Sequence, residues 1–224
     1  MSHVEVVGVS KDYWNQNIST KALNNVSLKI EKGDFCLIVG PSGSGKSTLL
    51  YVMSGLTEPS SGDVQISGKS IKGISSEKMA EIRREEFGFV FQFFNLIPNL
   101  NVLDNVMLPQ VIGHHIDENR ALEVLRIVGM AEFKDRFPDQ LSGGMRQKVA
   151  IARAIVNEPG LLFADEPTGN LDQKSGREIM ELLQKLNHTN GITVVVVTHN
   201  PDHLIYGSRK VELLDGVVTS DEKL

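Results

Sequence analysis

Short apolar runs occupy both ends of this chain, and a helical pattern replaces them in the middle. Residues 4–9 and 22–30 are rich in apolar side chains and predict a pair of strands near the N-terminus. Three later runs are apolar, at 35–39, 161–164 and 192–197, and only Thr193 interrupts the last of them. A strand that is buried on both faces needs no alternating polar positions, so these runs predict the centre of a parallel sheet.

Helical periodicity dominates between about residues 93 and 157. Asp117 is a good N-cap for a helix that reaches residue 130, and Ser142 for a second helix that reaches residue 156. Each segment has one apolar face, as expected of a helix that covers a core. The residues of these two faces are Ala121, Val124, Leu125 and Val128, and then Val149, Ala152 and Ile155.

Further elements flank this middle region. A charged helix, capped by Ser75 or Ser76, is predicted to run to about residue 86, with a strand at 87–92 behind it. A later helix is predicted near residues 174–186. An Asp-Gly turn between two apolar segments at 211–218 predicts a C-terminal hairpin.

Composition narrows the possible partners. The chain has 224 residues, a net charge of −5 and 41% hydrophobic residues, which is ordinary for a globular protein. An acidic balance gives no global attraction to nucleic acid, so no nucleic-acid partner is expected. The one cysteine, Cys36, falls in a predicted buried strand and excludes an intrachain disulfide. We expect no secretory signal and no membrane span, because no apolar run approaches the ~20 residues that a span requires.

A glycine-rich segment directly after the apolar run 35–39 carries the strongest chemical signal. Strand, glycine loop and helix form the phosphate-binding P-loop, in which backbone N–H groups converge on a phosphate. Lys46 is expected to reach the β- and γ-phosphates, and the Ser47 hydroxyl to ligate Mg²⁺. The pattern G-x-x-x-x-G-K-[ST], followed by Thr48, is supplied by Gly40, Pro41, Ser42, Gly43, Ser44, Gly45, Lys46 and Ser47.

A second motif follows the apolar run 161–164. Asp165 stands at the carboxyl end of this predicted strand, where ligands bind in open parallel sheets. It is expected to hold Mg²⁺, usually through a water molecule. Glu166, one residue further on, is placed to polarise an attacking water. The alternative is an ordinary strand that ends in a solvated acidic turn.

A third motif separates P-loop families from one another. Ser142, Gly143 and Gly144 open the predicted helix that reaches residue 156, and they offer a second set of free N–H groups for phosphate. One phosphate needs only one P-loop. A second anion site on the same chain therefore suggests that each chain serves the nucleotide of its partner.

With these motifs in this order, the sequence resembles the ATP-binding cassette (ABC) ATPases over nearly the whole chain. The resemblance implies that Tyr13 stacks on adenine, although the adjacent Trp14 leaves the identity of the ring open. It implies that Gln92 contacts Mg²⁺ and the attacking water, and that His199 contacts the γ-phosphate. Asp172 matches the family's D-loop, which acts across a dimer, but it could instead only cap the following helix.

The resemblance also implies the fold. We expect an α/β protein with a P-loop NTPase core built on a mainly parallel sheet, an N-terminal antiparallel β subdomain and an inserted α-helical subdomain. The whole chain, residues 1–224, is predicted to be one nucleotide-binding domain. Residues 1–92 and 158–224 would form the core with the β subdomain, and residues 93–157 the helical subdomain with the signature motif.

By resemblance, two chains pair head to tail and sandwich two ATP molecules with Mg²⁺. The implied catalytic residues are Lys46, Gln92, Glu166 and His199, and the implied metal ligands are Ser47, Gln92 and Asp165. Four residues would act on the nucleotide of the partner chain in this ATP-dependent homodimer. These are Ser142, Gly143, Gly144 and Asp172.

A motor of this kind needs a separate transmembrane permease, which places the chain at the cytoplasmic face of the inner membrane. Residues 93–98 are unusually apolar and form either a groove for a coupling helix of the permease or part of the core. The pattern looks like ATPases of the lipoprotein-releasing and macrolide-exporting type, which predicts work on a lipoprotein, lipid, peptide or drug. The alternatives are a non-transport cassette ATPase acting in DNA repair or on ribosomes and, less favoured, a small-molecule kinase.

Overall fold

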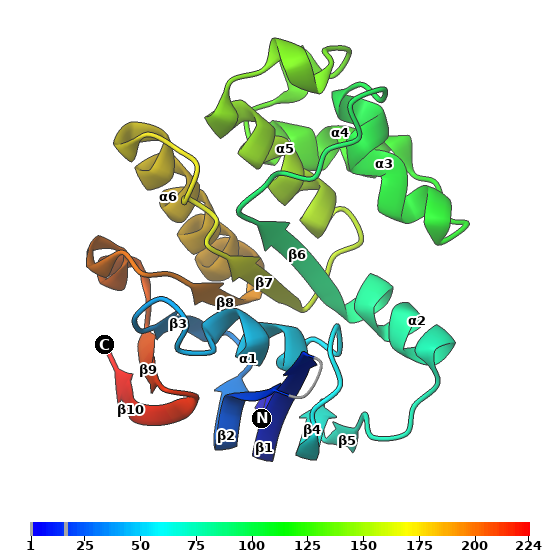
Figure 1. Cartoon of the computed structure of the whole chain (residues 1–224). Coiled ribbons are helices and arrows are strands. Elements are labelled where there is room, and N and C mark those ends of the chain that lie inside the picture. Colours follow the sequence, from blue (N-terminus) through cyan, green and yellow to red (C-terminus); the bar gives the residue numbers. More distant parts are fainter. Residues whose placement is uncertain (1, 16–17) are drawn as a thin grey trace.

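The computed structural model describes residues 2–15 and 18–224, and the strands in these ranges form two sheets (Figure 1). The larger sheet has the strand order β10-β9-β3-β8-β7-β6. The strands from β9 to β6 are parallel, and β10 is an antiparallel edge. Its strands are β3 (Phe35–Val39), β6 (Phe87–Phe91), β7 (Leu161–Asp165), β8 (Thr193–Val197), β9 (Arg209–Leu214) and β10 (Val217–Lys223).

The smaller sheet is antiparallel and has the order β2-β1-β4-β5. Its strands are β1 (Ser2–Asn15), β2 (Ile18–Glu31), β4 (Ser61–Ile66) and β5 (Lys69–Ser70). The predicted first strand ended at residue 9, but β1 continues well beyond it. The reason is a break in register between Val6 and Val9, around Gly8 at φ 56°, which interrupts the alternation of apolar side chains.

Helices cover both faces of the larger sheet, with α6 on one face and α1 on the other (Figure 1). A third group, α3 to α5, packs together beside β6 and lies between β6 and β7 in the chain. Among the described helices, none combines the length and apolarity that crossing a bilayer requires. The helices are α1 (Lys46–Met53), α2 (Ser76–Glu86), α3 (Val102–Ile112), α4 (Glu118–Ile127), α5 (Gly143–Ile155) and α6 (Gln173–Asn190), with the short 3-10 helices η1 (Ala131–Phe133), η2 (Pro138–Gln140) and η3 (Pro201–Tyr206).

The continuous apolar runs are explained by two cores on opposite faces of this sheet. In β8, Val194 and Val196 pack into the core beneath α6, whereas Val195 and Val197 pack into the core beneath α1. Strands β3 and β7 divide their side chains in the same way. The predicted α/β class, with its mainly parallel sheet, antiparallel N-terminal sheet and inserted helices, is confirmed.

Capping residues set the helix starts where the sequence predicts them. The side chains of Ser75, Asp117 and Ser142 each accept a hydrogen bond from the backbone N–H three residues on, at the start of α2, α4 and α5. The end of α4 differs from the prediction of residue 130. Gly129 adopts φ 72° and stops the helix early, as left-handed glycines do.

Candidate functional site

The carboxyl ends of three parallel strands bring the predicted motifs to one edge of the larger sheet. In the register of β7 and its neighbours, Asp165 is paired with Phe91 of β6 on one side and with Val197 of β8 on the other. Gln92 and His199 therefore follow the same edge. The P-loop leaves β3 at this edge as well, because Ile38 is paired with Val197. Ligands of open parallel sheets bind at this position.

The P-loop requires glycine where its backbone passes other strands. At Gly40, with φ 150°, a Cβ atom would lie 2.1 Å from the carbonyl oxygen of Leu213. At Gly45, with φ 99°, it would lie 2.3 Å from the carbonyl oxygen of Ala22. Any larger residue at either position would clash with backbone that cannot move alone. Two strands from different sheets therefore hold the loop in its phosphate-binding shape.

Lys46 is buried and its ammonium group donates to the loop itself. The Nζ atom lies 2.9 Å from the carbonyl oxygen of Gly40 and 2.8 Å from that of Pro41. The nearby Ser44 hydroxyl is also buried and has no hydrogen-bond partner among the described residues. A buried cation and an unpartnered donor in one loop fit an anionic group such as a phosphate.

The expected metal site rests on one close contact. The Ser47 hydroxyl donates to Oδ1 of Asp165 at 2.8 Å, which brings helix α1 and strand β7 together. Asp165 is only 8% exposed. A hydroxyl and a carboxylate are both oxygen ligands of the kind that Mg²⁺ prefers, so the donor set fits this ion.

Glu166 and His199 also lie in direct contact, with 2.8 Å between Oε1 and Nδ1. Glu166 adopts φ 48°, a left-handed conformation that is uncommon for glutamate. Its N–H donates to the carbonyl oxygen of Val197 at 3.0 Å, which fixes this turn. Strained backbone of this kind is often found at functional sites.

These groups surround a cavity of about 500 Å³. Tyr13 lines it, whereas Trp14 does not and is 73% exposed, so Tyr13 is the better candidate for the stacking ring. Among the predicted residues, those lining the cavity are Tyr13, Ser42, Gly43, Gly45, Lys46, Ser47, Thr48, Gln92, Glu166 and His199. Asp165 sits directly behind Ser47.

Gln92 lines the cavity but is linked to the loop that precedes α6. Its carbonyl oxygen accepts a hydrogen bond from Nδ2 of Asn170 at 3.0 Å, and its Nε2 approaches Oδ1 of the same residue at 3.5 Å. A Cβ atom at Gly169 would lie 2.8 Å from Nε2 of Gln92. Gln92 therefore links its own loop to the loop at 168–172.

The residues expected to act on a partner's nucleotide lie outside this cavity. Ser142 caps α5 and Asp172 caps α6, where it accepts hydrogen bonds from the N–H and the hydroxyl of Ser175. These two bonds hold the pKa of Asp172 below its ordinary value. Gly143 and Gly144 form the first turn of α5. Capping by Asp172 is thus seen, and a role across a dimer stays a prediction.

Three structural partners of the site were missed from the sequence. The Tyr51 hydroxyl donates to Oδ2 of Asp165 at 2.7 Å. The buried amide of Gln147 donates to the carbonyl oxygens of Phe91 and Pro167. These bonds connect α5 to the end of β6 and to the turn after β7. His203 contacts the hydroxyl of Thr198, the residue before His199, at 2.8 Å. Tyr51 could have been found from the sequence, because it comes four residues after Ser47 and so lies on the same face of a helix.

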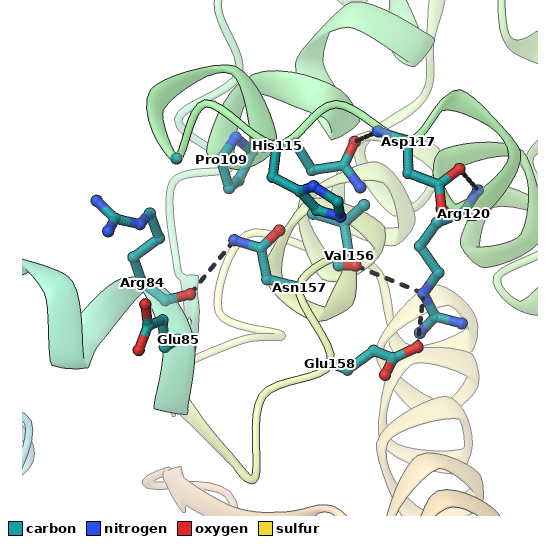
Figure 2. A pocket seen from close by; sticks show the side chains of 11 residues that line it. Arg84, Glu85, Pro109, His115, Asp117, Arg120, Val156, Asn157 and Glu158 are labelled. Atoms are coloured by element: carbon teal, nitrogen blue, oxygen red, sulfur yellow. Dashed lines mark hydrogen bonds and ion pairs between the residues drawn. The ribbon is translucent and has the colours of Figure 1, made fainter.

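A second cavity, of about 440 Å³, lies away from this edge, between the end of α2 and the helices α3 to α5 (Figure 2). Its polar groups largely bind one another. Arg120 donates to the carbonyl oxygen of Val156 and pairs with Glu158, and Asn157 donates to the carbonyl oxygen of Arg84. It has no glycine loop and no contact between a hydroxyl and a strand-end carboxylate, so it does not match a nucleotide site.

Comparisons with known proteins show the family of this chain. A family model described as "ABC transporter" matches residues 23–169. The chain is 45% identical to the macrolide export ATP-binding/permease protein MacB of Bdellovibrio bacteriovorus, over 99% of this chain but only 34% of that protein. It is 46% identical to the ABC transporter ATP-binding protein MJ0796 of Methanocaldococcus jannaschii, over 99% of this chain and 97% of the relative.

Solved structures of ABC proteins have the same fold as this chain. A dimeric structure of MJ0796 in a post-hydrolysis state, bound to ADP and Pi, superposes with a TM-score of 0.90 at 44% identity, covering 99% of this chain and 98% of that one. CbiO1 from Clostridium perfringens, described as part of the ABC transporter complex cbiONQ, superposes with a TM-score of 0.88 at 30% identity, covering 99% and 88%.

Proposed function

This chain belongs to the ABC transporter family of ATPases and is an ATP hydrolase, and from that premise we propose that it is the motor of a membrane exporter. In this proposal two copies close on ATP, and a separate permease carries out the work across the membrane. The observation that carries the proposal is the convergence of Lys46, Ser47, Asp165, Glu166 and His199 on one sheet edge.

The chemistry follows from the contacts at that edge. Lys46 would exchange its two carbonyl partners for phosphate oxygens and so stabilise the charge of the transferring phosphoryl group. Glu166 would accept a proton from, or orient, the attacking water, and His199 would hold the γ-phosphate. Ser47 and Asp165, with Gln92, would hold Mg²⁺, which when bound neutralises charge on the phosphates.

The dimer is proposed from the position of the signature residues. The cavity of the same chain is not lined by Ser142, Gly143 or Gly144. A nucleotide bound in that cavity therefore cannot use the free N–H groups at the start of α5, which are suited to an anion. In a head-to-tail pair, the signature of one chain faces the P-loop of the other. Support comes from the relative MJ0796, whose solved structures are dimeric.

A permease contact is proposed beside the helical insertion. An apolar groove of about 460 Å³ runs between β6 and α3 and is bordered by Arg83, Arg84 and Arg153. It is suited to an amphipathic helix whose apolar face enters the groove and whose acidic residues meet the arginines. Its apolar lining includes Leu56, Phe87, Phe89, Phe91, Leu108 and Ile112. The sequence directed attention to residues 93–98, which come shortly after β6, one wall of this groove.

Helix α5 connects the segment 93–98 to the signature. Arg153 donates to the carbonyl oxygens of Phe94 and Asn95, at 3.0 and 2.6 Å. Arg146, two residues after Gly144 on α5, lies over the ring of Phe94 at 5.0 Å from its centroid. A permease that moves this segment would thereby move the helix that contacts the partner's nucleotide.

Location and substrate follow from the proposed partner. A permease-bound motor sits at the cytoplasmic face of the inner membrane. The relative MacB is named for macrolide export, and this chain spans about a third of the length of that relative. We propose the same broad task, export or mechanical work on a lipoprotein, lipid, peptide or drug, with the choice of substrate made by the permease.

The test first asks whether a reading frame beside this chain encodes a multi-span membrane protein, and then reconstitutes that protein in vesicles. The wild-type chain is expected to bind these vesicles and to change its rate of ATP turnover. Ile112→Asp, in the groove and 61% exposed, is expected to lose binding while basal turnover remains. The matched control is Val7→Asp, an exposed strand residue outside the groove, which should keep both. Failure of the wild type to bind any neighbouring membrane protein would favour a non-transport ATPase.

A further inference from the structure

Both oxygens of the Asp165 carboxylate are held by side chains of the same helix. The Ser47 hydroxyl donates to Oδ1 at 2.8 Å, and the Tyr51 hydroxyl donates to Oδ2 at 2.7 Å. The two donors are four residues apart on α1, which places them on one face of that helix, one turn apart. The P-loop pattern explains Ser47 but leaves Tyr51 without a role.

Tyr51 differs from its neighbours on α1. Leu49, Leu50, Val52 and Met53 are fully buried apolar residues of the core between the sheets. Tyr51 is half-buried, and its ring packs against the edge of that core.

We propose that Tyr51 is a positioning residue for the magnesium-binding carboxylate of Asp165. The terminal torsion of an aspartate is broad, so a single hydrogen bond leaves the carboxylate free to rotate. With Ser47 on one oxygen and Tyr51 on the other, the orientation of the group is fixed before the ion arrives. The bond also reduces the negative charge that the buried carboxylate must bear alone. This inference rests on the metal role of Asp165 in the proposed function.

Partners of this kind matter for metal affinity. Residues that hydrogen-bond a metal-ligating carboxylate typically change metal affinity by about 10–100-fold when they are removed. Tyr51→Phe deletes one oxygen atom and keeps the ring that packs on the core. We therefore expect weaker metal binding with little loss of stability.

The experiment measures binding of Mn²⁺ by electron paramagnetic resonance, on the full chain saturated with a non-hydrolysable ATP analogue. Tyr51→Phe is expected to raise the Kd for Mn²⁺ about tenfold. Nucleotide binding without metal and the thermal midpoint should stay at wild-type values. High Mg²⁺ should restore the turnover of Tyr51→Phe. The matched control is Tyr206→Phe, whose ring packs against the other core and which should bind Mn²⁺ like the wild type.

Asp165→Asn separates failure of this inference from failure of the proposed site. If Asp165→Asn abolishes Mn²⁺ binding while Tyr51→Phe leaves the Kd unchanged, Tyr51 only fills space and the inference is overturned. If Asp165→Asn itself binds Mn²⁺ like the wild type, Asp165 is not a metal ligand and the proposed function loses its metal site as well.

Discussion

The imidazole of His199 and the carboxylate of Glu166 lie in contact, with 2.8 Å between Nδ1 and Oε1. They come from the ends of adjacent strands, β8 and β7, and the backbone bond from Glu166 to Val197 holds the two ends together. Glu166 is 18% exposed in its side chain and His199 is 68% exposed, so the histidine lies on the open side of the pair. In the proposed function, the two side chains act together on the attacking water and the γ-phosphate.

Glu166→Gln is expected to reduce ATP turnover by about 10²–10⁴-fold, because positioned acid–base groups contribute that much to a rate. The amide keeps the size of the side chain but is a poor base. Binding of ATP should be unchanged, because Lys46 and the P-loop remain in place. Turnover by phosphate release and affinity by a fluorescent ATP analogue measure the two effects. Glu132→Gln, at an exposed position in η1, is the control; normal turnover in Glu166→Gln would contradict the assigned role.

The apolar segment 93–98 is divided between two roles. Phe93 is 69% exposed and Ile97 is 42% exposed, whereas Leu96 packs against the core beneath the helical insertion. Aspartate at Phe93 and Ile97 together should leave basal turnover and the thermal midpoint unchanged but uncouple the chain from its permease. Leu96→Asp should destabilise the fold by roughly 1–3 kcal/mol or more, because it places a polar group in an apolar site.

Urea unfolding and basal turnover of these two variants measure the difference. If the Phe93 and Ile97 double variant unfolds as readily as Leu96→Asp, the whole segment is a part of the core. The coupling role would then fall to the groove alone.

Stability is expected to fall in mild acid. Burial lowers the pKa of His203 below its ordinary value of 6.5, with Glu166 and Asp202 acting in the opposite direction and His199 reinforcing it. The unfolded chain therefore binds a proton more readily than the folded chain as the pH falls below about 6.5. The contribution of neutral His203 is complete above that pH and is lost as the pH falls through the lowered pKa. Burial lowers the pKa of His3 in the same way, helped by Lys32, so both residues act in the same direction.

Thermal unfolding between pH 7.5 and 5.5 measures this loss. His203→Asn keeps a polar group beside the Thr198 hydroxyl but cannot titrate, so its thermal midpoint should fall less steeply with pH than that of the wild type. His188→Asn, at an exposed position, should keep the wild-type slope. An identical slope in His203→Asn and the wild type would show that His203 is not the titrating group.

Helices and strands are predicted best from the sequence where a few neighbouring residues determine the local structure. The cap residues Ser75, Asp117 and Ser142 and the apolar run at 35–39 give element boundaries directly, because each signal is contained in a few neighbouring residues. The motifs identified the family, which the comparisons confirm. The helix α3 was not predicted as a separate element, because its apolar residues are not confined to one face and Pro109 interrupts the pattern.

What could not be predicted depends on contacts between distant segments. Neither the choice of Tyr13 over Trp14 nor the bond from Tyr51 to Asp165 is visible until the sheets are assembled. The link between Gln92 and Asn170 likewise joins residues 78 positions apart. These contacts belong to the tertiary structure, and apart from the four-residue spacing between Ser47 and Tyr51 on α1, local pattern carries no information about them.

Two of these chains are proposed to close on ATP, and the mass of Glu166→Gln in solution tests this dimerisation. Light scattering would be recorded with and without Mg-ATP, alongside the ATP turnover of the wild type. Mg-ATP is expected to double the mass of Glu166→Gln, and the wild type is expected to hydrolyse ATP. A chain that stays monomeric with Mg-ATP, while the wild type still turns ATP over, would contradict the claim and show that the signature residues do not act on a partner's nucleotide.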